Sequence, residues 1–119
     1  MEIKTHIVNS INIAEAVSDN LIIQSAQDAL DLLGNAYYQG FDRIIIHEKN
    51  ITPEFFDLKT KLAGDILQKF SNYRVRLAIV GDFSTYQSKS IRDFIFESNK
   101  TRHIIFVDTT EKALEKLSE

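Results

Sequence analysis

The sequence contains no cysteine, only one proline and only four glycines among its 119 residues. Without cysteine, the protein cannot form disulfides, thiolate metal sites or cysteine nucleophiles. So little proline and glycine leaves no linker, and we expect a single domain over residues 1–119. No run approaches the roughly 20 apolar residues that span a bilayer, and MEIKTHIVNS lacks the features of a secretion signal. We therefore expect a cytoplasmic protein with no membrane partner.

Neither sign of charge dominates. Fourteen basic and 17 acidic residues give a formal net charge of −3. This balance supplies no general attraction to nucleic acid, so we expect no nucleic-acid partner. His6, His47 and His103 are dispersed and form no H-x-x-x-H spacing. We therefore expect neither a metal site nor a cofactor.

Apolar residues are plentiful, at 44%, and they are patterned. Residues 2–8 alternate apolar and polar, and Asn9-Ser10 separates them from residues 11–17, which predicts a β-hairpin. Continuous apolar runs predict strands that are covered on both faces, as in a parallel sheet. These runs lie at Arg43 to His47, Val75 to Val80 and His103 to Val107.

Capping residues followed by apolar residues at spacings of three and four predict four helices. The helices begin at Ser25 with Asp28, at Thr52-Pro53-Glu54, at Ser90 with Asp93, and at Asp108 or Thr109. The first should end near Gly40, because glycine readily takes the left-handed conformation that closes a helix. The second should be long and amphipathic through Phe70, with an irregular first turn before Asp57.

The predicted order is ββαβαβαβα. Strands separated by helices of this length imply right-handed crossovers and a mostly parallel central sheet, with the N-terminal hairpin supplying one antiparallel pair. The fold class is therefore α/β. The hairpin also leaves an exposed sheet edge, and a homodimer is one way to cover it.

In such a sheet, ligands bind beyond the carboxyl ends of the strands. The segment GDFSTYQSKS follows a predicted strand and precedes a helix, as a phosphate loop does, although the second glycine of that motif is absent. The residues there that could bind a small molecule or an anion are Asp82, Ser84, Tyr86, Ser88, Lys89 and Ser90, with His47 at the neighbouring strand end. Capping of the helix by Ser88 or Ser90 is the structural alternative.

The same strand ends hold residue types found in acyl-transfer triads. His47 could act as a base, Ser84 as nucleophile and Asp82 as orienting acid. No G-x-S-x-G elbow surrounds Ser84, and nothing in the spacing requires a triad. We therefore assign no catalytic residue, and a small enzyme stays the third hypothesis.

The stretch FFDLKTKLAGDILQKFSNYRVRLAIVGDFS, together with ESNK at 97–100, is similar to a bacterial domain of unknown function, family number 4180. The likeness extends over nearly the whole chain. It implies the fold of that family and no particular activity.

A more distant resemblance is to the sulfate-transporter and anti-sigma-factor-antagonist (STAS) fold. It is carried by Phe56-Asp57 before an apolar helix and by Val75 to Gly81. The D-S/T-S-G pattern of those domains maps onto residues 57–60. Leu58 takes the place of the phospho-acceptor, no glycine follows, and Thr60 is the one hydroxyl nearby.

The STAS resemblance implies a small regulatory switch domain. Our first hypothesis is therefore a non-enzymatic regulatory domain that binds another protein near the start of the second helix. The residues expected at that surface are Asp57, Lys59, Thr60 and Lys61. The alternative is a protein that binds a small molecule or an anion such as phosphate through residues 81–90.

Overall fold

A computed structural model describes all of residues 1–119 and places five strands in one sheet. The strands are β1 (Glu2–Val8), β2 (Ile11–Val17), β3 (Arg43–His47), β4 (Arg76–Val80) and β5 (Ile104–Val107). They lie side by side in the order β1-β2-β3-β4-β5, with β1 antiparallel to β2 and every other pair parallel. The predicted order ββαβαβαβα and the mostly parallel sheet are confirmed.

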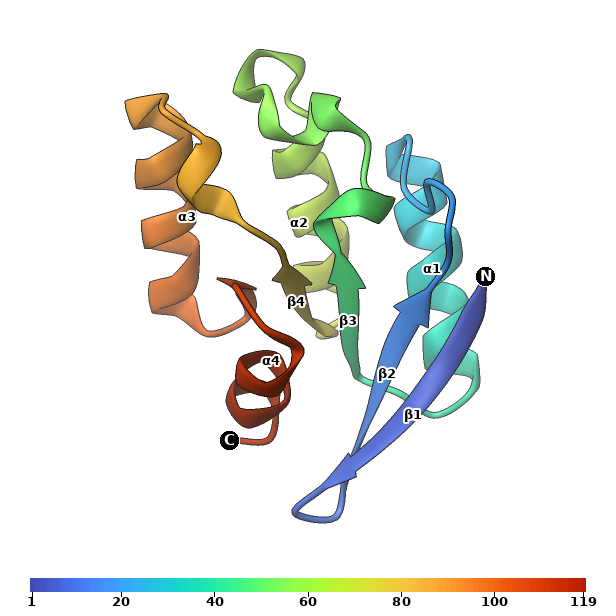
Figure 1. Ribbon diagram of the computed structural model, residues 1–119. Coiled ribbons are helices and arrows are strands. Elements are labelled where there is room, and N and C mark those ends of the chain that lie inside the picture. Colours follow the sequence, from blue (N-terminus) through green and yellow to red (C-terminus); the bar gives the residue numbers. More distant parts are fainter.

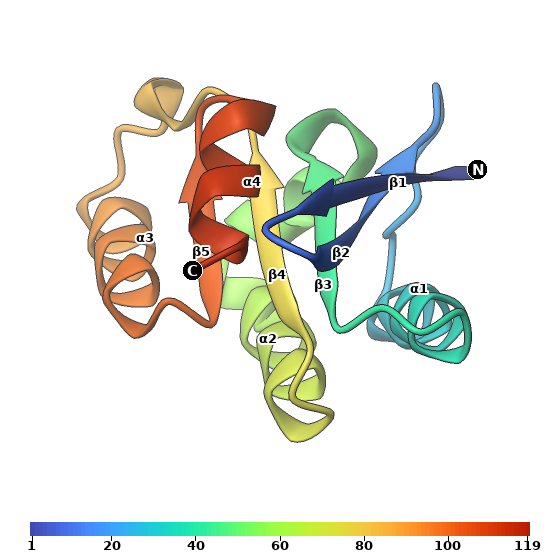
Figure 2. The same ribbon diagram turned by 90° about the horizontal axis from the view of Figure 1, so that it is seen from below.

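Four α-helices cover the two faces of the sheet unequally. They are α1 (Ala26–Tyr38), α2 (Leu62–Asn72), α3 (Lys89–Thr101) and α4 (Thr110–Leu117). The first three lie on one face, and α4 alone lies on the other (Figures 1 and 2). The three-helix face holds a core of 22 buried residues and the α4 face a core of seven. Most of the apolar burial that stabilises the fold is therefore on the three-helix side.

The central strand β3 shows why its apolar run is continuous. Ile44 and Ile46 enter the three-helix core, and Ile45 enters the α4 core. All three side chains are fully buried. Each contributes roughly 1.5–3 kcal/mol through burial, so β3 anchors both layers. None of the four helices is both long and apolar enough to cross a membrane.

The hairpin closes through Asn9 and Ser10, which have φ values of 53° and 68°. Positive φ at both central residues is typical of a two-residue type I′ turn, whose twist matches that of the flanking strands. The register from Val8 opposite Ile11 to Glu2 opposite Val17 is one-to-one, without a bulge. The predicted hairpin is thus confirmed.

The caps of the first and last helices follow the sequence. The Ser25 side chain accepts a hydrogen bond from the backbone N–H of Asp28, and Thr109 accepts one from Lys112. Gly40 takes a φ of 94°, two residues after α1 ends. These contacts satisfy N–H groups that a helix leaves without partners.

The second helix is much shorter than predicted. Two 3₁₀ turns, η2 (Pro53–Phe56) and η3 (Leu58–Thr60), occupy its expected beginning, and α2 starts only at Leu62. Thr52 caps the first turn and Asp57 the second. Lys61 then takes a left-handed conformation, with φ 63°. Residues inside a right-handed α-helix do not take this conformation, so the helix cannot run through Lys61. The long helix through residues 52–70 was therefore a wrong prediction, because two local caps compete with helix propagation.

The predicted capping box of the third helix is also wrong. The helix begins at Lys89, so Ser90 is inside it, and Ser88 at the N-cap makes no side-chain hydrogen bond. Asp93 instead pairs with Lys89, at 2.7 Å between carboxylate and ammonium. An i,i+4 ion pair between Lys89 and Asp93 therefore forms in place of the predicted capping box.

The β5 edge of the sheet is closed by side chains of α3. The Phe106 N–H donates to Asn99 Oδ1 at 2.7 Å, and Asn99 Nδ2 donates to the Phe106 carbonyl at 3.2 Å. The Ser98 hydroxyl donates to the Ile104 carbonyl at 2.7 Å. Backbone groups that a further strand would need are therefore already bonded.

Candidate functional site

Short turns follow β3 and β4 at the carboxyl ends of the strands, where the sequence predicts a site. Besides η2 and η3, they are η1 (Glu48–Asn50) and η4 (Phe83–Thr85). We call this end of the sheet, from residue 47 to 61 and from 81 to 91, the rim. It contains every site residue predicted from the sequence.

Two turns of the rim are built in the same way, from the sequences DLKT and DFST. Asp57 accepts a hydrogen bond from the N–H two residues on, at Lys59, and Asp82 accepts one from Ser84, each at 3.1 Å. In each turn the closing threonine donates its hydroxyl to the backbone carbonyl of the aspartate. A D-x-x-T pattern was therefore a signal in the sequence, since such side chains form local turns.

Aromatic side chains hold the two parts of the rim together. The rings of Phe56 and Tyr86 are stacked, with centroids 4.8 Å apart. Phe83 packs beside both, at 6.0 and 6.3 Å, and meets Phe106 of β5 edge-on at 5.3 Å. Aromatic pairs at these separations are stabilising beyond their burial. The segment after β3 and the segment after β4 thus form one surface.

A partly buried hydrogen bond also supports this stack. The Tyr86 hydroxyl donates to Glu48 Oε2 at 2.5 Å. Burial, the hydrogen bond and the charge of Glu48 raise the pKa of Tyr86 well above its usual range. Glu48 lies over Gly81, where an added Cβ would be 2.6 Å from the Glu48 Cβ. Only glycine fits beneath that side chain without displacing it.

The structure brings the two predicted groups of site residues to one shallow pocket of about 350 Å³. Asp57 and Lys59 line it from one side, and Ser88 and Ser90 line it from the start of α3. Phe56, Leu58 and Ile91 complete its lining. The sequence does not show this juxtaposition, because residues 57 and 88 meet only after the aromatic stack has formed.

Several of the predicted anion-binding groups already have partners inside the protein. The Ser84 hydroxyl donates to Asp82 at 2.5 Å, which together with the Ser84 N–H keeps the pKa of that carboxyl below its usual value. Tyr86 bonds Glu48, and the Lys89 ammonium bonds Asp93. The lysine pKa is raised by that contact. A ligand at residues 81–90 would have to displace these bonds.

His47 does not join Ser84 and Asp82 in a triad. Its Nε2 lies 2.6 Å from Glu15 Oε2, whereas the Ser84 hydroxyl bonds Asp82 directly. Because a carboxylate can only accept, the His47 nitrogen that faces it carries the proton. That nitrogen is therefore not free to take a proton from a nucleophile.

Glu15 is the polar residue that sequence reasoning missed. It lies on β2, on the α4 face, and its other oxygen is 2.7 Å from His6 Nε2 on β1. One carboxylate thus joins three strands. Burial alone would raise the pKa of Glu15, but the hydrogen bonds and charges of His47 and His6 outweigh it and hold the pKa below 4.5. The signal was a glutamate inside the otherwise apolar INIAEAV, since buried glutamates are nearly always paired.

The segment predicted to bind a partner lies on the surface. Lys59, Thr60 and Lys61 are all exposed, and neither lysine forms an ion pair. The Thr60 hydroxyl donates to the carbonyls of Glu54 and Asp57, each at 2.8 Å. It also accepts the N–H of Leu62 at 3.2 Å. Thr60 therefore stabilises the turn on which Lys59 and Lys61 are exposed to solvent.

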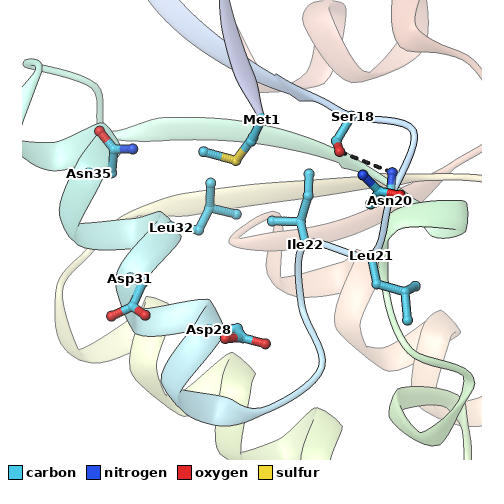
Figure 3. Close-up of a pocket in the computed structure, with 9 residues that line it drawn as sticks. All are labelled: Met1, Ser18, Asn20, Leu21, Ile22, Asp28, Asp31, Leu32 and Asn35. Carbon is cyan, nitrogen blue, oxygen red and sulfur yellow. Dashed lines mark hydrogen bonds between the residues drawn. The ribbon is translucent and has the colours of Figure 1, made fainter.

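A second pocket, of about 390 Å³, lies between α1 and the segment after β2 (Figure 3). Met1, Ile22 and Leu32 lie together at its centre, and Asp28 and Asp31 extend from α1. It contains none of the predicted site residues. Nowhere in the chain do three or more histidine, aspartate or glutamate side chains come together in a way that could hold a metal ion.

Comparisons with known proteins agree with the fold. No curated protein matches the chain. A crystal structure from Thermotoga maritima, described as a proposed anti-sigma factor antagonist, matches with 14% sequence identity and a TM-score of 0.51. The match covers 98% of this chain and 95% of that one, so the two share a fold. A family model described as a domain of unknown function, DUF4180, matches residues 8–117, and the chain therefore belongs to that family.

Proposed function

We propose that this protein is a non-enzymatic regulatory domain that binds another protein through the rim. The observation that carries the proposal is the exposed turn at residues 57–61, whose two lysines lack ion-pair partners. This turn stands beside the pocket lined by Ser88 and Ser90. The fold is shared with a structure described as a proposed anti-sigma factor antagonist, which is a name for a regulatory protein.

The charge of the turn at residues 57–61 suggests the chemistry of the partner. The protein is negative overall, at −3, but Lys59 and Lys61 place positive charge on this surface. Asp57, the acid within this turn, is already bonded to the backbone of its own turn. A partner with an acidic surface patch fits this arrangement, because complementary charge speeds encounter and fixes orientation.

The geometry supports protein binding better than the two alternatives. Five of the seven residues predicted to bind a small ligand direct polar atoms to internal partners: Asp82, Ser84, Tyr86, Lys89 and His47. In the possible triad, His47 is bonded to Glu15, whereas Ser84 is bonded to Asp82. The pocket is also shallow and open, as suits a flat protein contact more than enclosure of a small molecule.

The test is a comparison of retained proteins. The wild-type chain, the double variant Lys59→Glu/Lys61→Glu and a control, Lys100→Glu/Lys116→Glu, are immobilised and exposed to lysate of the encoding organism. Both double variants change the net charge equally, and the control lysines lie on α3 and α4. Mass spectrometry then quantifies the proteins that each retains.

We expect at least one protein that is retained by the wild type and the control and is lost from the rim variant. Equal thermal unfolding midpoints for the three chains show that the loss is not unfolding. The same set of proteins on all three would overturn the proposal. A chain stabilised by inorganic phosphate or nucleotides in a thermal-shift assay would favour the small-ligand alternative, since ligands that bind the native state raise its stability.

A further inference from the structure

Strand β1 has an edge whose backbone groups form no hydrogen bonds within the chain. In a two-residue hairpin, the residues that flank the turn form a hydrogen-bonded pair, and such pairs alternate along the ladder. Val8 and Ile11 are that first pair, so the N–H and C=O groups of residues 3, 5 and 7 point away from β2. None of the backbone hydrogen bonds in turns and loops involves residues 1–8.

Apart from the exposed Lys4, β1 lacks the devices that usually protect an edge. It contains no proline, its register has no bulge, and it is seven residues long. The opposite edge, β5, has four residues and is closed by Ser98 and Asn99. Long, regular and unprotected edges are templates for a further strand.

The residues at the free edge are complementary to themselves. Read from 3 to 7, the strand is Ile-Lys-Thr-His-Ile, and it reads the same way reversed except for the exchange of Lys4 and His6. Two copies paired antiparallel about Thr5 therefore place Ile3 opposite Ile7 of the second copy. The Ile7 side chain is 71% exposed in the single chain, and this contact buries it.

The other face of the same pairing is polar and also matches. It places Lys4 of one copy opposite His6 of the second. When the His6 ring is neutral and its Nε2–H is donated to Glu15, Nδ1 is left as an acceptor. Lys4 has no ion-pair partner in the single chain. Its ammonium can donate to that nitrogen, which extends the polar cluster from one copy into the next.

We propose that the chain forms a homodimer in which two β1 edges pair antiparallel about Thr5 and join the two sheets into one of ten strands. The pairing forms about six backbone hydrogen bonds, through residues 3, 5 and 7 of each copy. Because β5 is closed, assembly stops at two copies. The inference concerns an edge of the sheet and does not depend on the function proposed for the rim.

The absence of cysteine allows a direct test of this register. Directly opposed residues of a hydrogen-bonded antiparallel pair have Cα atoms about 5.5 Å apart, which is within the range of a disulfide. Thr5→Cys is the substitution that places a thiol on the two-fold axis. Ile7→Cys is its matched control on the same strand, because residue 7 faces residue 3 rather than itself.

We expect Thr5→Cys to form a covalent dimer under mild oxidation and Ile7→Cys to remain largely uncross-linked. Light scattering should give wild type a mass of two chains, and Ile7→Lys a mass of one. Tyr38→Lys, at an exposed aromatic residue on α1, should remain dimeric. A wild-type chain that is monomeric up to about 1 mM, or faster cross-linking of Ile7→Cys than of Thr5→Cys, would overturn the proposal.

Discussion

The two edges of the sheet are treated in opposite ways. At β5, the side chains of Asn99 and Ser98 occupy backbone groups that point outward. At β1, the corresponding groups of residues 3, 5 and 7 have no partner within the chain. The difference teaches that edge protection in this fold comes from the helix beside the edge. Helix α3 packs against β5 and supplies these side chains (Figure 1), whereas no helix supplies a hydrogen-bonding side chain to residues 3, 5 and 7 of β1.

The largest effect should come from breaking the closed edge with Asn99→Ala. This change leaves the N–H and C=O of Phe106 without their partners and should lower the free energy of unfolding by about 2–3 kcal/mol. It also creates a second open edge, so assemblies larger than two chains should appear as concentration rises. Urea unfolding and light scattering measure the two effects.

Asn35→Ala is the matched control for that prediction. Its amide oxygen accepts only from the Gln39 side chain, on the surface of α1. We expect little change in unfolding and no larger assemblies. If Asn99→Ala behaved in the same way, the hydrogen bonds of Asn99 would not be what closes the β5 edge.

A smaller effect is expected from Glu15→Gln, which weakens the hydrogen bonds that join Glu15 to His6 of β1 and to His47 of β3. The glutamine NH₂ group takes the place of one accepting oxygen, so one imidazole must change tautomer or lose its hydrogen bond, and the free energy of unfolding at neutral pH should fall by about 1–2 kcal/mol. His6 is held less firmly, so amide hydrogen exchange in β1 should quicken. Exchange in β4 serves as the internal reference.

Acid should distinguish the same variant from wild type. The pKa of Glu15 is lower in the folded protein than in the unfolded chain, so its charge stabilises the fold above about pH 4.5. That stabilisation is lost as pH falls through the folded pKa. Wild type should therefore lose more stability than Glu15→Gln between pH 6 and pH 3. Parallel losses in urea titrations would show that the carboxylate is not responsible.

The smallest effect should follow Ser98→Ala. It removes one hydrogen bond, from the serine hydroxyl to the Ile104 carbonyl, and leaves both bonds of Asn99 intact. A loss of about 0.5–1.5 kcal/mol is expected, with no change in the number of chains per assembly. A loss as large as that of Asn99→Ala would mean that the two residues do not share the edge as described.

Most of the architecture could be predicted because it depends on local pattern. The alternation in residues 2–8, the turn at Asn9-Ser10 and the triple isoleucine of β3 each specify one kind of strand. The caps at Ser25 and Thr109 also act within a few residues of the sequence. In all of these, local preference and final environment agree.

The errors arose where two local signals compete or where distant residues meet. Around residues 52–61 the apolar spacing favours a helix, but Asp57 caps a separate turn and Lys61 turns left-handed. Tertiary contacts decide between such alternatives, and the spacing of apolar residues does not reveal those contacts.

The same limit applies to the candidate site. The predicted residues lie at the rim, as the carboxyl-end rule for parallel strands requires. Their hydrogen bonds could not be foreseen, since His47 meets Glu15 from 32 positions away and Tyr86 meets Glu48 from 38. A pattern names residue types near a strand end, but it does not say which of them bond each other.

The close approach of Glu48 to Gly81 has one more consequence. The Glu48 side chain, which follows β3, fills the space that a side chain at position 81, which follows β4, would need. The same Glu48 carboxylate receives the Tyr86 hydroxyl, which ties the stacked rings to that volume. A larger side chain at position 48 or 81 should therefore displace Tyr86 and the aromatic rings that stack on it.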